Sequence, residues 1–290
     1  MKLAEKSYSY MRYFCCIGLI ISLCLNAQTI NRQCDRSRDE FVPSGGLDYI
    51  KMNQINSTLF HERNYGKHSK NWKKYYPLLS HFISNHFESQ ESISMIEIGT
   101  CHGGNADYIL NHLKRVQLYV IDPFLPNYDT DDSVSLMFNN YAHKYNLSDQ
   151  QISNYWTHAM FHDMEQKYGC RYKLFNTTSS NACRFFSDKS MDVIFIDGLH
   201  TYEGVKQDII CFAPKLKENG ILLFNDYEVR MFPGVTKAVN RYAFSNDLTV
   251  GTGTNLRPPG QSNAFIIRLP NRSWGRWKEE NRKSNGMINT

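Results

Sequence analysis

A buried strand that ends on an acid and an imidazole is the part of this sequence best suited to chemistry. Apolar residues dominate 191–196, which predicts a strand buried on both faces of a sheet. Asp197 follows directly, and His200 comes shortly after it. Ligands of open α/β sheets bind at the carboxyl ends of the strands, so we expect Asp197 and His200 to act on a ligand. The plainer alternative is that Asp197 caps the next helix and His200 is an ordinary loop histidine.

A glycine-rich loop follows another predicted strand, in the run Glu97-Ile98-Gly99-Thr100-Cys101-His102-Gly103-Gly104. Its glycines allow a tight turn and the close approach of a ligand to the amides that begin the next helix. Asp122 ends the following strand about twenty residues later, where an acid can accept hydrogen bonds from ribose hydroxyls. The pair predicts a nucleoside-containing cofactor; otherwise the loop is only a turn and Asp122 a cap or salt-bridge partner.

Alternating strands and helices must position these groups. The apolar pattern predicts strands at 94–98, 117–122, 173–175, 193–197, 220–224, 248–250 and 264–268, the last two as an edge hairpin. Helices are predicted between them at 105–114, 202–212 and 235–244, and helical spacing of apolar residues runs through 48–88. The fold class is therefore α/β, with a doubly wound, mainly parallel, seven-stranded Rossmann-like sheet.

The connection between the second and third strands, residues 123–171, is much longer than a crossover needs. It contains predicted helices at 134–145 and 149–168. Because it enters at the ligand-binding edge, we expect this helical insertion to act as a lid or acceptor-binding element, and a decorative helical hairpin is the alternative.

Several stretches occur together and in the order found in one enzyme family. They are Glu97-Ile98-Gly99-Thr100 with Gly103-Gly104, then Ile121-Asp122-Pro123, then 195–208, then 220–227, then Pro233-Gly234-Val235. From about residue 72 to 270 the chain resembles the class I S-adenosylmethionine-dependent methyltransferases. Within them it is similar to the metal-dependent sugar O-methyltransferases that act on macrolide and aminocoumarin sugars.

The resemblance implies a role for each motif. S-adenosylmethionine would bind Glu97, Gly99, Thr100, Cys101, Gly103, Gly104, Asp122 and Asp197. A divalent metal, usually Mg²⁺, would bind Asp197, Asn225 and Asp226, and oxygen ligands at neighbouring strand ends suit a hard cation. Such a metal would hold a sugar diol and lower the pKa of the attacking hydroxyl. His200 is the expected general base, because imidazole titrates near neutral pH, and Asp197 is its catalytic partner.

Asn225 departs from the family pattern, which has an acid at this position. An amide oxygen can still coordinate a cation, but the site loses one negative charge and should bind Mg²⁺ more weakly. A satisfied polar turn after the strand is the alternative for Asn225 and Asp226.

The charge distribution and the targeting signals limit the cellular compartments and the binding partners that we expect. The formal net charge of +5 comes from the two ends of the chain, so the body is close to neutral and a nucleic-acid groove is not expected. The uncharged segment 14–25 follows basic residues and is short for a membrane anchor, which favours a cleaved signal peptide over a signal anchor of a type II membrane protein. Sequons at Asn56, Asn146, Asn176 and Asn271 agree with a secreted protein or one of the endoplasmic reticulum or Golgi lumen.

Five cysteines follow the targeting segment: Cys34, Cys101, Cys170, Cys183 and Cys211. An odd number in an oxidising compartment leaves one thiol unpaired, and we assign it to Cys101, where a bridge would distort the glycine loop. Pairing Cys170 with Cys183 and Cys34 with Cys211 is one of three possibilities for the rest, and the sequence does not choose among them. No cysteine or histidine spacing indicates a structural zinc.

The sequence therefore predicts a signal peptide or anchor (1–27), a stem (28–47), a methyltransferase domain (48–270) and a basic tail (271–290). The expected activity is S-adenosylmethionine-dependent O-methylation of a glycan sugar or a small hydroxylated acceptor in the secretory pathway, with a membrane contact only through an uncleaved N-terminal segment. The main alternative is a catalytically retired scaffold that serves as a secreted binding protein. An NAD-dependent oxidoreductase would explain the glycine loop and Asp122, but not the residues after the fourth and fifth strands.

Overall fold

The structure is a computed structural model, and it describes residues 69–101, 103–125, 128–129, 131, 148, 151, 164–252 and 262–268. The helices are α3 (Ser69–His86), α4 (Gly104–His112), α7 (Ser179–Ala182), α8 (Tyr202–Phe212) and α9 (Pro233–Ser245), with 3-10 turns η1 (Gly169–Arg171), η2 (Cys183–Phe185) and η3 (Ala213–Lys215). The strands are β1 (Ile93–Ile98), β2 (Val116–Ile121), β3 (Tyr172–Phe175), β4 (Met191–Ile196), β5 (Leu216–Tyr227), β6 (Gly251–Thr252) and β7 (Ser262–Ile267).

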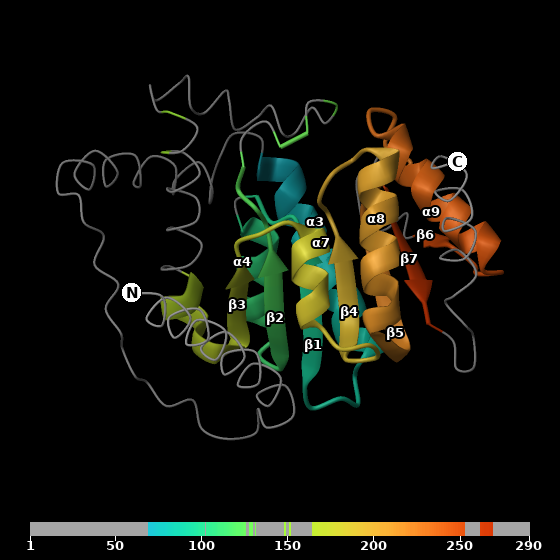
Figure 1. The fold of residues 1–290 in the computed structure, drawn as a ribbon. Coiled ribbons are helices and arrows are strands. Elements are labelled where there is room, and N and C mark those ends of the chain that lie inside the picture. The colour runs from blue at the N-terminus through green and yellow to red at the C-terminus, as the bar shows by residue number, and fades with distance from the viewer. Residues whose placement is uncertain are drawn as a thin grey trace, which may run out of the picture. The chain divides into compact units, whose positions relative to one another are not determined.

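These strands form one seven-stranded sheet in the order β3-β2-β1-β4-β5-β7-β6 (Figure 1). The strands β1 to β5 pair in parallel, whereas β7 is antiparallel to β5 and β6 is antiparallel to β7. The order reverses at β1, between its neighbours β2 and β4, and open sheets bind ligands at such a switch point. The predicted doubly wound, mainly parallel sheet is confirmed.

Helices cover both faces of the sheet because its central strands are apolar on both sides. Met95 and Val193 contribute to a core on one face, together with side chains of α3 and α4. Ile96 and Ile194 contribute to a second core on the other face, with side chains of α8 and α9. All residues of β4 are buried, as its nearly uninterrupted apolar run predicts.

The position of strand β6 differs from the predicted one, and the structure describes only part of the predicted helical insertion. The edge strand β6 lies at Gly251–Thr252 rather than at 248–250, because Leu248 N donates to Ala243 O at 2.9 Å and so continues the end of α9. In the insertion, residues 164–168 are helical, and Met164 and Tyr168 are buried in the core. The helix predicted at 134–145 and most of that at 149–168, and with them the lid, lie outside the described residues.

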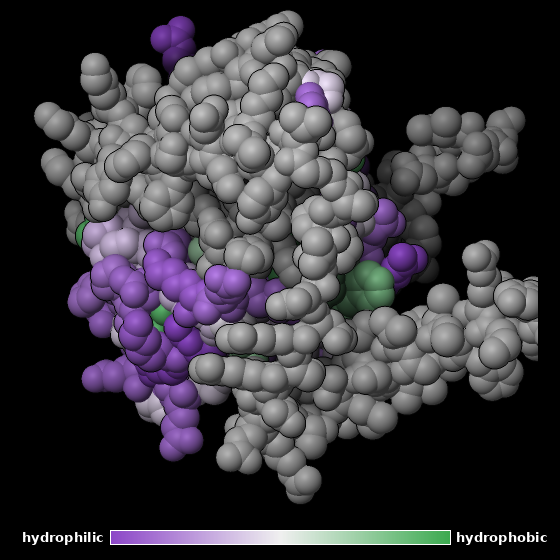
Figure 2. Space-filling model, turned by 90° about the vertical axis from the view of Figure 1, so that its left-hand side faces the viewer, coloured by the Kyte–Doolittle hydropathy of each residue, from purple (hydrophilic) through white to green (hydrophobic). Residues whose placement is uncertain are grey.

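The outer edge of the sheet is strand β3, on which Lys173 is exposed. Figure 2 shows this side of the molecule, where most of the described side chains in view are hydrophilic. Lysine on an edge strand discourages pairing with another chain. Among the described residues, no helix combines the length and the apolar character that crossing a bilayer requires. The predicted targeting segment (1–27), stem (28–47) and basic tail (271–290) lie outside these residues.

Candidate active site

The predicted site residues come together because four parallel strands are in register near their carboxyl ends. Ile98 of β1 is in register with Ile121 of β2 and with Ile196 of β4, and Ile196 is in register with Phe224 of β5. The next residue after each of these positions on β2, β4 and β5 is Asp122, Asp197 or Asn225. The polar groups that were predicted from separate motifs therefore share one edge of the sheet.

The chain turns away from β1 at Gly99, where only glycine fits. Its φ is +78°, and a Cβ atom there would lie 2.2 Å from the carbonyl oxygen of Asp197. Gly103, with φ of +67°, is the N-cap of α4. Cys101 between them also has a positive φ. These left-handed residues bring the glycine loop against the end of β4 and start the helix whose amides would face a ligand.

Asp122 fastens the glycine loop to the end of β2. Its Oδ2 accepts hydrogen bonds from the backbone N–H groups of Thr100 (2.9 Å) and Cys101 (3.0 Å), and its Oδ1 accepts one from Phe124 (2.8 Å). Burial raises the pKa of Asp122, and these three hydrogen bonds oppose the rise. A carboxylate has about four acceptor positions, and the three backbone N–H groups leave about one of them for a ribose hydroxyl. Binding of ribose by Asp122 stays a prediction. The fastening role was not predicted from the sequence.

Glu97 is a buried acid with one unsatisfied oxygen. It is 1% exposed, and Asn105 of α4 donates to its Oε1 at 3.1 Å. Its Oε2 is buried and has no hydrogen-bond partner among the described residues. Burial first, and then the charges of Asp197 and Asp122, raise the pKa of Glu97 to about 8. A buried carboxyl oxygen without a hydrogen-bond partner is costly, so a ligand that forms a hydrogen bond with this atom would be favoured.

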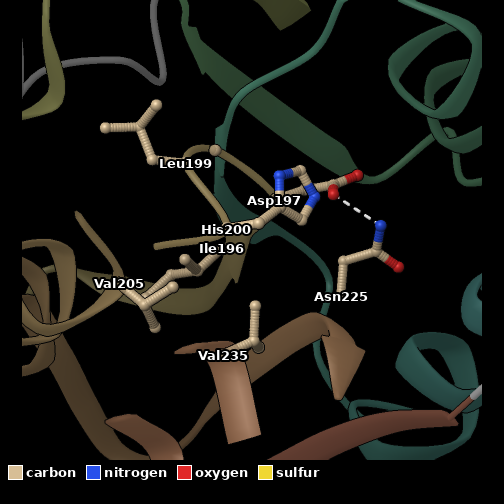
Figure 3. A pocket seen from close by; sticks show the side chains of 8 residues that line it. Ile196, Asp197, Leu199, His200, Val205, Asn225 and Val235 are labelled. Atoms are coloured by element: carbon tan, nitrogen blue, oxygen red, sulfur yellow. Dashed lines mark hydrogen bonds between the residues drawn. The ribbon is translucent and has the colours of Figure 1, made fainter. Parts of the chain in front are cut away.

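Asp197, Asn225, Asp226 and His200 form a second group of polar side chains at the same edge. Asn225 Nδ2 donates to Asp197 Oδ1, as the dashed line in Figure 3 shows, and to Asp226 Oδ2 at 3.1 Å. His200 Nε2 lies 3.1 Å from the same Asp226 Oδ2. Asp226 has a φ of +54°. This strained turn directs its carboxylate toward both neighbours.

Two features that the sequence analysis missed hold His200 in place. The ring of Phe232 lies 4.1 Å from the His200 ring, centroid to centroid. Gly234, near the start of α9, packs so closely on this loop that a Cβ atom there would lie 2.7 Å from the His200 carbonyl oxygen. The run Pro233-Gly234-Val235 was the available signal, since a glycine near a helix start can mark close packing.

A pocket opens beside this group, with His200, Asp197 and Asn225 as its polar wall. Figure 3 shows the apolar side chains that line the rest of it: Ile196, Leu199, Val205 and Val235. The pocket is small, with an empty volume of about 190 Å³, so it is a hollow beside the polar group rather than a space that holds a whole ligand.

The arrangement differs from the predicted Mg²⁺ site at one atom. Ligand atoms of Asp197, His200 and Asp226 lie within 4.8 Å of one another, which is close enough for a metal cluster. However, Asn225 directs its amide nitrogen, not its oxygen, at both carboxylates. Mg²⁺ needs oxygen ligands in near-octahedral geometry. The set Asp197, Asn225 and Asp226 therefore does not fit Mg²⁺ as it stands, because an amide N–H₂ points to where the cation would lie.

Two known proteins have sequences related to parts of this chain. An uncharacterized protein of Acanthamoeba polyphaga mimivirus is 27% identical over 163 residues, which are 55% of this chain and 62% of that protein. An uncharacterized protein of Sinorhizobium fredii is 37% identical over 65 residues, which are 22% of this chain and 7% of that protein. The chain thus spans less than two thirds of the length of either relative.

One solved structure has a similar overall fold. The O-methyltransferase NovP superposes with a TM-score of 0.50 at 15% identity, covering 78% of this chain and 100% of that chain. At this identity the likeness concerns the fold. Residues 96–227, which include the glycine loop, Asp122, Asp197, His200 and Asn225-Asp226, match the methyltransferase domain family. The matched part of the chain is therefore similar to methyltransferase domains, and its sheet has the mainly parallel, Rossmann-like strand order described above.

Proposed function

We propose that this chain is an S-adenosylmethionine-dependent O-methyltransferase. One observation carries the proposal. The glycine loop packs directly on the loop that holds His200, because Gly99 leaves no room for a side chain against Asp197 and Asp197 N donates to Ile98 O at 2.8 Å. A cofactor bound by the first loop would therefore lie beside the polar groups of the second, within the part of the chain that matches the methyltransferase domain family.

The acidic character of this edge supports the choice of cofactor. Glu97, Asp122 and Asp197 are close enough that the charges of Asp197 and Asp122 raise the pKa of Glu97. The carboxylates of Asp122 and Asp197 favour a cationic ligand over an anionic one such as NAD, and the buried Oε2 of Glu97 has no hydrogen-bond partner among the described residues. When bound, S-adenosylmethionine supplies a methyl group already activated by its sulfonium sulfur. Glu97, Gly99, Thr100, Cys101, Gly103, Gly104, Asp122 and Asp197 are the residues proposed to hold it.

His200 is proposed to take the proton of the acceptor hydroxyl. When Nε2–H donates to Asp226, the neutral ring carries its lone pair on Nδ1, so this atom can accept the proton. The acceptor oxygen would then receive the methyl group that S-adenosylmethionine supplies, and the proton would stay on the His200 imidazole. Asp226 stabilises the imidazolium that results, and Phe232 restrains the ring. Asp197 lies directly after β4 and lines the pocket. The proposed proton transfer to His200 does not involve Mg²⁺.

A sugar hydroxyl on a glycan of the secretory pathway is the proposed acceptor. The N-terminal segment and the sequons support this compartment. The disulfide between Cys183 and Cys211 supports it as well, because disulfides persist mainly in oxidising compartments. The acceptor class rests on the family resemblance and on the compartment, and is the least direct part of the proposal.

The test is a methyl-transfer assay on the glycosylated protein. We would incubate it with S-adenosylmethionine and a panel of glycans, catechols and lipids, and detect methylated products by mass spectrometry. We expect methylation of a glycan hydroxyl, and a fall in kcat of about 10²–10⁴-fold for His200→Ala with unchanged cofactor affinity. His86→Ala is the matched control, because His86 lies at the end of α3 and contacts Asn219 O. Methylation of a catechol or lipid alone would overturn the acceptor class, and the absence of cofactor binding would favour a retired scaffold.

A further inference from the structure

We infer that Asn225 takes the place of a divalent metal ion in this site, so that methyl transfer by this chain needs none. The catalytic half of this inference rests on the function proposed above; the structural half does not. It starts from the two hydrogen bonds that Asn225 Nδ2 donates, one to Asp197 Oδ1 and one to Asp226 Oδ2.

Two carboxylates at neighbouring strand ends repel each other unless something between them is positive or donates hydrogen bonds. A dication is one solution, and an amide N–H₂ group is another, because each of its two hydrogens can bond to one carboxylate. Asn225 is 4% exposed and Asp226 is 8% exposed, so water competes little for these bonds. The orientation of the amide follows from this chemistry, since its oxygen would otherwise face two negative oxygens.

A cation would have to undo this arrangement before it could bind. The Asn225 amide would lose both hydrogen bonds and turn so that its oxygen faces the ion. Asp226 Oδ2 would also be shared, because it already accepts from Asn225 and lies against His200 Nε2. This site has two carboxylates, whereas a site with an acid in place of Asn225 would have three. It therefore attracts a cation less strongly. The acids and His200 are thus already aligned without a metal.

We predict that the substitution Asn225→Asp creates a binding site for a divalent cation. A third carboxylate at this position would create an all-oxygen site on the ends of β4 and β5, which suits Mg²⁺ or Mn²⁺. The matched control is Asn240→Asp, which adds the same charge at an exposed position of α9. Isothermal titration of MgCl₂ and MnCl₂ into the wild type and both variants measures binding, with KCl at equal ionic strength as the blank.

We expect no saturable binding to the wild type or to Asn240→Asp, and saturable binding to Asn225→Asp with an affinity at least tenfold above the detection limit that applies to the wild type. Saturable sub-millimolar binding to the wild type would overturn the inference, and so would a folded Asn225→Asp variant that binds no better than the wild type. If Asn225→Asp folds only when Mg²⁺ is present, that dependence supports the inference, and the wild-type titration still decides independently.

A second measurement addresses catalysis. Wild-type methyl transfer should be unchanged in excess EDTA, and a loss of activity that added Mg²⁺ restores would overturn the catalytic half of the inference. If the protein transfers no methyl group at all, the proposed function fails. The ion titrations would still test the role of Asn225, because they do not depend on turnover.

Discussion

Asp122 shows how one residue can serve both the fold and the proposed cofactor. Its carboxylate accepts three backbone hydrogen bonds, two of them from the glycine loop. The acid that was predicted to bind ribose is therefore also the group that fixes the loop on which the cofactor would rest. A loss of cofactor binding in an Asp122 variant has two possible causes, which the following comparison separates.

We expect Asp122→Ala to lower the free energy of unfolding by about 2 kcal/mol, because buried N–H groups lose their acceptor. It should also abolish S-adenosylhomocysteine binding. Asp122→Asn keeps one carbonyl oxygen and should lose less stability. Urea unfolding followed at equilibrium gives the first quantity and titration calorimetry the second. Unchanged stability in Asp122→Ala would contradict the fastening role.

Glu97 predicts a pH dependence of stability. Burial, the main cause, raises the pKa of Glu97 from about 4.5 to about 8, so between these values the native state holds a proton that the unfolded chain has released. The contribution of Glu97 to the free energy of unfolding is therefore fully present below about pH 4.5 and is lost as the pH rises to about 8. Glu97→Gln should flatten this decline, whereas Glu88→Gln at an exposed position should not. Parallel slopes for all three proteins, in urea unfolding at pH 5.5 and pH 8, would contradict the assignment.

At the scale of elements, the contact between the glycine loop and the end of β4 is the part of the architecture on which the site depends. Gly99→Ala would place a Cβ atom 2.2 Å from the Asp197 carbonyl oxygen, and backbone must move to relieve it. Gly169 has a similar positive φ of +57°, but nothing lies within 4 Å of its Cβ position. Gly169→Ala therefore measures only the free-energy cost of placing alanine in a left-handed backbone conformation, which is about 1–2 kcal/mol.

We expect Gly99→Ala to lose at least about 2 kcal/mol more stability than Gly169→Ala, and to lose cofactor affinity as well. Thermal and urea unfolding of the two variants, with calorimetric titration of S-adenosylhomocysteine, make the comparison. If the two substitutions cost the same, the close approach of the two loops is not a constraint on the fold.

The elements were predictable from the sequence because apolar periodicity determines which segments are buried. The strands β1, β2, β4 and β5, and the helix α8, lie where their apolar patterns place them. The strand β6 does not, because the short segment 248–250 has β-branched residues but also extends the end of α9. Side-chain partners were less predictable: the orientation of the Asn225 amide and the tilted contact of the Phe232 ring with the His200 ring depend on distances that only the folded chain sets.

At the scale of the whole molecule, the disulfide changes how the cysteines must be paired. Cys183 of η2 is bonded to Cys211 of α8. Pairing Cys170 with Cys183 and Cys34 with Cys211 is therefore wrong. The sequence left three pairings open because spacing does not determine which thiols meet.

Peptide mapping by mass spectrometry without reduction should find Cys183 linked to Cys211, and a Cys170–Cys183 link would contradict this pairing. Replacing Cys183 and Cys211 by serine should lower the free energy of unfolding by about 3 kcal/mol, since the bond closes a loop with a sequence separation of 28.

The most direct test of the central claim is calorimetric titration of S-adenosylhomocysteine into the glycosylated protein from residue 28 onward. We predict saturable micromolar binding that Asp122→Ala abolishes and that added Mg²⁺ does not change. Asp247→Ala, at an exposed acid after α9, is the matched control and should bind as the wild type does. No binding by the wild-type protein, with or without Mg²⁺, would contradict the proposed cofactor and with it the role of His200 in methyl transfer.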